Sequence, residues 1–258
     1  MISKSDIKHL RSLKQKKYRE KYNEFLIEGF RVIKFALESD SQLKTLFLTD
    51  RFNSSYSSHP IMDKIKNKIE SIKIIDEKIM RKITNTETPS GISALCSLPK
   101  LNRDIKSLNG PGLFLDSIAD PGNLGTICRT ALWFGVNNII LSEKCVDPFN
   151  PKVLRGGMGS HFFLKFFNIS IKNLSENNYK IIGTDTLGIP INEYNWEKTD
   201  KWVLVLGGEA RGISQENRIL LDETISIPKY GHGESLNVAI SGAILLSGLS
   251  GCFHDKNL

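Results

Sequence analysis

The chain has 258 residues, of which 40% are hydrophobic and 24% are charged, and these globular proportions exclude a disordered or collagen-like protein. Its four cysteines form no CxxC pair and have no histidines clustered near them, so we expect no metal, no disulfide framework and a reduced setting. The formal net charge of +7 indicates an acidic partner such as nucleic acid.

The positive charge is concentrated in the first part of the chain. Residues 1–110 hold 22 Lys and Arg against 13 Asp and Glu, whereas residues 111–258 hold 13 against 15. Eight of the basic side chains fall within the first 21 residues: Lys4, Lys8, Arg11, Lys14, Lys16, Lys17, Arg19 and Lys21. Such a cluster is typical of a phosphate-binding surface, and the alternative is a solvated lysine-rich helix face.

Neither end of the chain predicts a membrane partner. The N-terminal residues are polar and basic, without the apolar stretch of a secretory signal. The longest apolar run, residues 236–253, includes Asn237 and is interrupted by Ser and Gly, which is typical of a buried helix. We therefore expect a cytoplasmic protein.

Residues 1–98 alternate between helical and strand patterns. Apolar positions at helical spacing predict helices, and short apolar runs bounded by polar residues predict strands. In chain order we expect a helix at 2–17, a strand at 25–27, a helix at 30–37, a strand at 43–48, a helix at 61–69, a strand at 72–75, a helix at 76–83 and a strand at 91–98. This order predicts a small α/β domain over residues 1–98.

The alternation of helical and strand patterns stops between Pro99 and Gly112. This stretch contains two prolines and two glycines and has no sustained period, and the charge balance of the chain changes here. We interpret residues 99–111 as a linker between two domains.

Residues 112–258 predict an open α/β sheet wound by helices. We expect strands at 113–115, 138–141, 162–166, 180–184, 201–206 and 224–227, and helices at 123–134, 148–158, 173–177 and 235–253. The run at 201–206 is apolar on both faces, as in a strand buried within a parallel sheet.

Three strand ends in this second domain carry unusual polar and glycine content. They are the stretches Leu115–Gly135, Leu206–Ser214 and Ile227–Ala239. Each could be no more than a tight turn or a helix cap, with Ser235 as the expected cap of the last helix. Because open α/β sheets bind ligands outside the carboxyl ends of their strands, we expect the three loops to form one site.

The motifs in these loops are DPGNLGTICRTALWFG, GGEARGIS and IPKYGHGESLNVA, and they resemble, in order and spacing, the three signature motifs of the SpoU or TrmH-like RNA 2′-O-ribose methyltransferases of the SPOUT superfamily. The earlier segment KYREKYNEFLIEGFRVIKFAL is similar to the small, ribosomal-protein-like RNA-binding domain that often precedes that catalytic domain. The resemblance implies a C-terminal SPOUT-type α/β domain with a trefoil knot, which topology rules alone do not predict.

The resemblance also implies a cofactor and a set of site residues. S-adenosylmethionine would lie against Thr184, Gly207, Gly208, Ile227 and Leu236. The polar catalytic positions would be Asn123, Arg129, Glu209, Ser235 and Asn237, and a homodimer would complete the site.

The implied reaction is the attack of a ribose 2′-hydroxyl on the activated methyl carbon. A guanidinium stays protonated in proteins, so we expect Arg129 to bind phosphate and to stabilise developing alkoxide rather than to act as a base. Glu209 would either orient Arg129 or accept the proton, and the sequence leaves both roles open.

Two positions depart from the family pattern, because Lys229 stands where methionine is usual and Ala210 where glycine is common. Three functions therefore stay open. The first is a methyltransferase acting on ribosomal RNA, with transfer RNA as the second choice of substrate. The second is a non-catalytic RNA-binding or ribosome-assembly protein on a degenerate methylase fold. A nucleotide-dependent dehydrogenase is disfavoured, because no GxGxxG motif precedes a suitable acidic residue.

Overall fold

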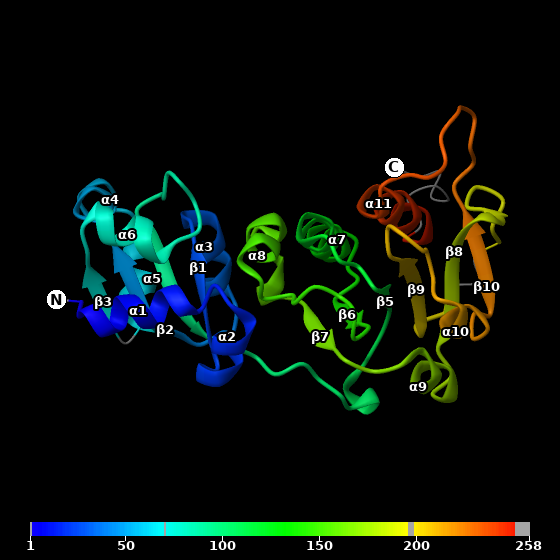
Figure 1. The fold of residues 1–258 in the computed structure, drawn as a ribbon, viewed down its shortest axis with the longest axis horizontal. Coiled ribbons are helices and arrows are strands. Elements are labelled where there is room, and N and C mark those ends of the chain that lie inside the picture. Colours follow the sequence, from blue (N-terminus) through cyan, green and yellow to red (C-terminus); the bar gives the residue numbers. More distant parts are fainter. Residues whose placement is uncertain (1, 70, 196–198, 251–258) are drawn as a thin grey trace. The chain divides into compact units, whose positions relative to one another are not determined.

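The computed structural model describes residues 2–69, 71–195 and 199–250 (Figure 1). The chain divides into two compact units. The first unit consists of Met1–Lys100 together with Asp147–Phe162, and the second consists of Leu101–Val146 and Phe163–Leu258. The segment Asp147–Phe162 falls within the sequence range expected for the second domain, yet it packs with the first unit.

The first unit is built on a four-stranded sheet with the strand order β1-β4-β2-β3. Its strands are β1 (Glu24–Glu28), β2 (Leu43–Leu48), β3 (Ser71–Ile74) and β4 (Ile92–Ser97). β4 runs antiparallel to both β1 and β2, whereas β2 and β3 are parallel. The four expected strands are thus confirmed, with ends that differ by one residue or less.

Helices surround this sheet. They are α1 (Lys4–Ser12), α2 (Lys16–Tyr22), α3 (Phe30–Glu38), α4 (Asp50–Tyr56), α5 (Ile61–Lys68) and α6 (Glu77–Ile83), with α8 (Pro151–Gly157) from the later segment. α1 packs on α6, and α2 and α8 both pack on β1. A core cluster that includes Leu10, Phe47 and Met80 joins α1 and α6 to the sheet.

The expected single helix over residues 2–17 is wrong, because the chain forms two helices there. α1 ends after Ser12, where the backbone N–H of Leu13 bonds back to Leu10, and Gln15 is extended before α2 begins. Leu13 is buried at this corner with 2% of its surface exposed. The break keeps Leu13 in the core and turns Arg19 of α2 inward, which a helical period read along the sequence does not show.

The second unit is built on a six-stranded, wholly parallel sheet with the order β10-β8-β9-β5-β6-β7. Its strands are β5 (Gly112–Asp116), β6 (Asn138–Leu141), β7 (Lys165–Phe167), β8 (Lys180–Pro190), β9 (Trp202–Gly207) and β10 (Glu223–Ser226). Residues 202–206 are all buried, as the continuous apolar run of β9 predicts. The expected open, parallel α/β sheet is confirmed.

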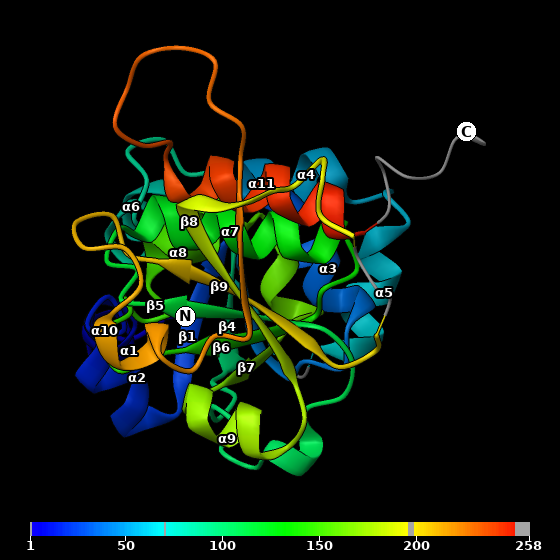
Figure 2. The ribbon, with the colours of Figure 1, turned by 90° about the vertical axis from the view of Figure 1, so that its right-hand side faces the viewer.

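Helices lie on both faces of this sheet. α7 (Pro121–Trp133) and α11 (Val238–Leu249) pack against each other on one face, and α9 (Ile171–Glu176) lies on the other (Figures 1 and 2). A short helix α10 (Gln215–Arg218) follows β9. The core beneath α9 includes Phe114, Phe167 and Leu174. No helix in the described part of the chain is long and apolar enough to cross a membrane.

Several elements in the second half of the chain have ends that differ from those expected. β8 continues to Pro190 rather than ending at Thr184, because its last residues pair with β10 beyond a register shift. β7 begins at Lys165 and not at Phe162, since residues 160–162 form a short 3-10 turn. α8 begins at Pro151, where the Asn150 side chain caps it.

Candidate functional site

The three loops expected to converge do so at the carboxyl edge of the parallel sheet. β5 and β9 are neighbours, and Asp116 pairs with Gly207 at their ends. The loop after β5 therefore starts beside the loop after β9. The third loop leaves β10 and enters α11, which packs on α7. This arrangement brings residues from three distant parts of the sequence to one edge.

Three expected catalytic residues form a continuous chain of hydrogen bonds. The Nδ2 atom of Asn237 donates to Oδ1 of Asn123 at 2.9 Å, and Nδ2 of Asn123 donates to Oε1 of Glu209 at 2.6 Å. One residue comes from each loop. The chain thus connects all three motifs through side chains alone.

The direction of this chain is set by the backbone of α11. Asn237 is the N-cap of α11, and its Oδ1 accepts from the N–H groups of Ala239 at 2.9 Å and Ile240 at 3.4 Å. With its oxygen occupied by two donors, Asn237 can only donate to Asn123. Asn123 must then present its NH₂ to Glu209, whose carboxylate is the final acceptor of the chain.

Asn123 is available for this role because another residue caps α7. The helix begins at Pro121 rather than at Asn123, and the carboxylate of Asp120 accepts from the backbone N–H of Asn123 at 2.8 Å. Asp120 therefore neutralises the positive end of the helix itself. The local geometry therefore does not favour the binding of an anion at this helix start.

Ser235 lies in the exposed loop before α11 and does not cap it, contrary to the expectation, because Asn237 takes the N-cap position. Arg129 is exposed on α7 and forms no ion pair or side-chain hydrogen bond with any residue that the structure describes. It lies six positions after Asn123, a rotation of about 240° around the helix, so the two side chains point to different sides of α7. Their catalytic roles stay predictions.

A cavity of about 370 Å³ opens beside this edge of the sheet. Its walls come from the middle of β8, from the loop between β10 and α11, and from α11 itself. Four expected site residues line it: Thr184, Ile227, Ser235 and Leu236. A volume in this range, with mixed apolar and polar walls, is typical of a small-molecule site.

Gly207 and Gly208 are not among the residues that line this cavity. A Cβ atom on Gly207 would lie 2.2 Å from the carbonyl carbon of Gly212, and one on Gly208 would lie 2.5 Å from the carbonyl oxygen of Ser117. Both glycines are therefore needed for close packing of the chain against its own backbone. Their part in cofactor binding stays a prediction.

The departure at Lys229 has a local structural role. Lys229 lines the cavity, and its Nζ atom donates to the carbonyl oxygen of Gly233 at 2.5 Å. The ammonium group is thereby directed back to its own loop, which projects from the unit between β10 and α11 (Figure 2). Ala210, the second departure, is exposed.

Two aspartates that we did not assign to the site support it. Asp116 is 3% exposed and accepts from the backbone N–H of Ser214 at 2.8 Å and from Nδ2 of Asn217 at 2.9 Å, so it ties the loop after β9 to the end of β5. Burial alone raises the pKa of Asp116, but the hydrogen bonds from Asn217, Ser214 and Ser117 together hold it below its ordinary value. Its place as the last residue of a buried strand is the signal that could have identified it.

The second supporting aspartate is Asp185, which lines the cavity next to Thr184. Arg218 pairs with its carboxylate at 2.5 Å, and the N–H of Leu187 donates to its other oxygen at 3.1 Å. The hydrogen bond from Arg218 is the main cause that lowers the pKa of Asp185. Across the described residues there is no group of three or more His, Cys, Asp or Glu side chains that could hold a metal ion.

Comparison with known protein families matches two parts of the chain. Residues 111–247 match the SpoU rRNA Methylase family, and residues 4–94 match the MRM3-like substrate binding domain. Both matches agree with the resemblance found in the motifs.

Curated relatives extend the likeness over nearly the whole chain. The 23S rRNA (guanosine(2553)-2′-O)-methyltransferase RlmP of Bacillus subtilis is 32% identical, over 95% of this chain and 96% of the relative. The mitochondrial rRNA methyltransferase 3 of Xenopus laevis is 31% identical, over 90% of this chain and 70% of the relative.

Solved structures share the fold. A TrmH-family protein from Porphyromonas gingivalis has a TM-score of 0.83 at 31% identity, over 96% of this chain and 98% of that one. An AdoMet-bound rRNA methyltransferase from Sinorhizobium meliloti has a TM-score of 0.83 at 26% identity, over 98% and 97% of the two chains. The expected fold class is confirmed.

Proposed function

This chain belongs to the SpoU rRNA methylase family, and we propose that it transfers a methyl group from S-adenosylmethionine to a ribose 2′-hydroxyl of ribosomal RNA. The observation that carries the proposal is the hydrogen-bond chain from Asn237 through Asn123 to Glu209, which lies at the edge of the sheet that holds the cavity. An intact chain of this kind argues against a degenerate, non-catalytic fold.

The cavity between β8 and α11 fits S-adenosylmethionine in size and in the chemistry of its walls. Ile227, Leu236 and Leu245 supply apolar surface for a flat base, and Thr184 and the backbone of the long loop supply polar groups. When bound, the cofactor supplies a methyl group activated by a positive sulfur. We propose that Thr184, Ile227 and Leu236 hold it, with Gly207 and Gly208 shaping the loop that closes the site.

The residues of the hydrogen-bond chain orient the acceptor. A ribose hydroxyl is a weak acid, so its attack needs alignment and a group that accepts its proton. Glu209 is bonded to Asn123 through Oε1 and forms no ion pair with Arg129 within the described residues, which favours Glu209 as the proton acceptor. Arg129 then binds phosphate and stabilises the developing alkoxide, and Ser235 bonds the ribose.

We propose ribosomal RNA, rather than transfer RNA, as the substrate. The curated relatives RlmP and rRNA methyltransferase 3 are both named for ribosomal RNA, and their likeness spans 90% or more of this chain. The basic N-terminal residues match a domain described as substrate binding. We propose that residues 1–98 bind RNA, that residues 99–111 form the linker and that residues 112–258 carry the catalytic domain.

We also propose that the protein is a homodimer. Trp133 of α7 is 84% exposed and Ile240 of α11 is 54% exposed, and these two helices pack against each other. Large apolar side chains exposed this far are typical of an interface. A second copy of the chain that covers them would bring another α7, and with it another Arg129, toward the site.

The trefoil knot and the cytoplasmic location complete the proposal. The knot is supported by the fold match to the TrmH-family protein. The cytoplasmic location is supported by the substrate, since ribosomes assemble there, and by Cys96 and Cys128, which are buried free thiols.

The proposal is tested by binding and transfer with the full chain. Isothermal titration should detect one S-adenosylmethionine per chain, and labelled methyl groups should pass to ribosomal RNA from cells that lack the modification. Normal binding of both cofactor and RNA with no transfer would favour the ribosome-assembly alternative. Transfer to transfer RNA alone would overturn the choice of substrate.

A further inference from the structure

Helix α2 presents two tyrosines on its solvent side. The rings of Tyr18 and Tyr22 lie nearly parallel, with 12° between their planes and 6.3 Å between their centroids. Tyr22 is 38% exposed and Tyr18 is half-buried. Aromatic rings on a surface, aligned and open to solvent, are the usual platforms for unpaired nucleic-acid bases.

Lysines accompany both rings. The Nζ atom of Lys17 lies 4.8 Å from the centroid of Tyr18, and that of Lys21 lies 5.4 Å from the centroid of Tyr22. Cation–π contacts at exposed sites are weak, so these ammonium groups can leave the rings at small cost. A phosphate on either side of a stacked base would be within reach of such a flexible side chain.

The platform is held from its sides. The ring of His9 packs edge-on against Tyr22, with 4.4 Å between centroids, and Nε2 of His9 is 2.7 Å from Oε2 of Glu24. Glu24 also accepts from Nζ of Lys44 at 2.7 Å. His9 is thereby anchored to β1 and supports Tyr22.

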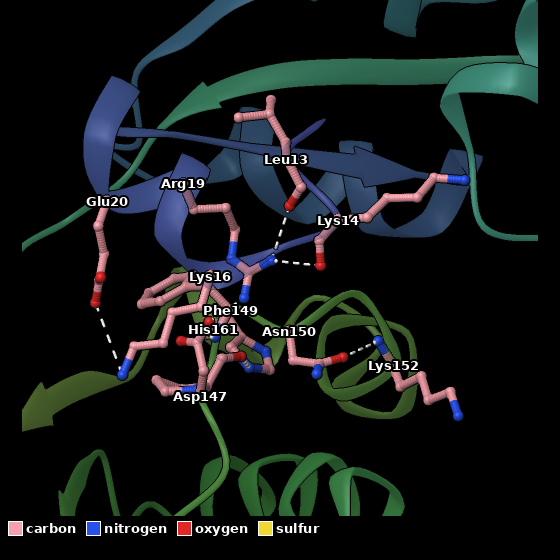
Figure 3. A network of polar contacts seen from close by, with 11 residues as sticks. Leu13, Lys14, Lys16, Arg19, Glu20, Asp147, Phe149, Asn150, Lys152 and His161 are labelled. Carbon is pink, nitrogen blue, oxygen red and sulfur yellow. Dashed lines mark hydrogen bonds and ion pairs between the residues drawn. The ribbon is translucent and has the colours of Figure 1, made fainter. Parts of the chain in front are cut away.

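Arg19, the buried residue of α2, anchors the helix to the body of the first unit. Its NH1 atom donates to the carbonyl oxygens of Leu13 at 2.8 Å and Lys14 at 3.0 Å, and its NH2 atom pairs with Asp147 (Figure 3). The Arg19 side chain is only 3% exposed. A short helix locked in this way offers its outer face without a further ordering cost on binding.

We propose that Tyr18 and Tyr22, with Lys17 and Lys21, form a stacking platform for an unpaired nucleotide of the RNA substrate. The proposal rests on the proposed function for the identity of the RNA, and it assigns base contacts where the charge pattern alone indicates phosphate contacts. Charge complementarity selects the occupant, because seven of the eight basic side chains among the first 21 residues are exposed and only Asp6 and Glu20 are acidic there.

Crosslinking and affinity together test the platform with the full chain. The probes are a single-stranded oligouridine that carries one 5-iodouridine and an RNA duplex of the same length. Irradiation should crosslink the single strand to the peptide that contains Tyr18 and Tyr22. Tyr22→Leu should weaken single-strand binding by roughly 5- to 150-fold, the usual effect of losing one base stack, whereas Tyr22→Phe should bind as the wild type does.

The lysines and a matched control complete the experiment. Lys17→Gln with Lys21→Gln should lower the salt dependence of binding by about 1.4 in the logarithmic slope, and Lys34→Gln with Lys64→Gln, exposed on other helices, should not. Equal binding by Tyr22→Leu and the wild type, or crosslinks only to other peptides, would overturn the platform. Methyl transfer by the wild type at saturating RNA separates this outcome from failure of the proposed function. Transfer persists if only the platform is wrong, and it is absent if the proposed function is wrong.

Discussion

The side-chain amide of Asn123 bonds to two other loops, the one after β9 and the one before α11. Its oxygen accepts from Asn237, and its NH₂ group donates to Glu209. The N-cap bonds of Asn237 to Ala239 and Ile240 fix the order of donors and acceptors. Orientation of Glu209 therefore depends on a helix cap more than 20 residues further along the chain.

Replacement of Asn123 by Ala should lower kcat for methyl transfer, because Glu209 then loses its fixed position. We expect a loss of roughly 100- to 1000-fold with little change in cofactor affinity, as for other preorganised donors. Single-turnover transfer and titration with S-adenosylmethionine measure the two effects. As a control, Asn173→Ala on α9 should leave kcat unchanged, and an equal loss in both variants would contradict the role of Asn123.

Replacement of Glu209 by Gln should remove the proposed proton acceptor while keeping a side chain of the same shape. The expected loss in kcat is roughly 100- to 10,000-fold. Single-turnover methyl transfer by both proteins measures this loss. A loss below about 10-fold would assign Glu209 a positioning role instead.

Asp116 should make the folded protein less stable as the pH falls into the acid range. Its pKa is lower in the folded protein than the ordinary value of 3.8, so its hydrogen bonds to Ser214 and Asn217 stabilise the fold fully above that value. This stabilisation is lost as the pH falls from about 3.8 through the folded pKa. Asp116→Asn should flatten that part of the stability curve in denaturation experiments, and an unchanged curve would contradict the assignment.

At the scale of elements, the strands were the most predictable parts of the fold. The strands at 43–48 and 138–141 match their expected bounds, because each is a short run of mostly buried residues between polar ones. α4 and α10 were missed, since α4 buries only Phe52 and α10 has four residues and no buried one. Neither helix has a detectable apolar period.

The break between α1 and α2 and the position of Asp147–Phe162 could not be read from the sequence. Arg19 contributes to both, because it donates to the carbonyl oxygens of Leu13 and Lys14 at the break and pairs with Asp147 at a separation of 128 residues. A basic residue within a lysine-rich segment gives no sign that it is buried. The same limit applies to the caps, because either Ser235 or Asn237 could begin α11 and only tertiary contacts select Asn237.

Replacement of the buried Arg19 should therefore lower the free energy of unfolding more than replacement of the exposed Lys16 on the same helix. Arg19→Met leaves Asp147 without its charge partner and should lower the free energy of unfolding by about 3–5 kcal/mol. Lys16→Met breaks the exposed pair with Glu20, whose side chains are about 60% exposed, and should cost at most about 1 kcal/mol. Denaturant titration compares them, and equal losses would contradict the anchoring role of Arg19.

At the scale of the whole molecule, the three motifs predicted the site better than any single element did. Order and spacing of the motifs identified the family, and the structure brings Asn123, Glu209 and Asn237 into direct contact. Arg129 joins no such contact among the described residues, and its part in the site rests on the proposed dimer. The target nucleotide has no signature in the motifs, since RNA substrates are selected by shape as well as by contacts.

The proposed homodimer can be tested in solution. Light scattering should give about twice the chain mass of 29.0 kDa, and Trp133→Glu should shift the protein toward the monomer and reduce transfer. Ile219→Glu, at a side chain 73% exposed outside α7 and α11, is the matched control and should remain dimeric. A monomeric and fully active wild type would rule out the shared site.

The proposed activity is ribose methylation of ribosomal RNA, and its most direct test locates the transferred methyl group. Ribosomal RNA labelled by the full chain and S-adenosylmethionine is digested with alkali, which cannot cleave the backbone next to a 2′-O-methylated ribose. We expect the label in alkali-resistant dinucleotides, and at least about 100-fold slower labelling with Asn123→Ala under the same conditions. Label in mononucleotides would mean base methylation, and it would contradict ribose methylation by this chain.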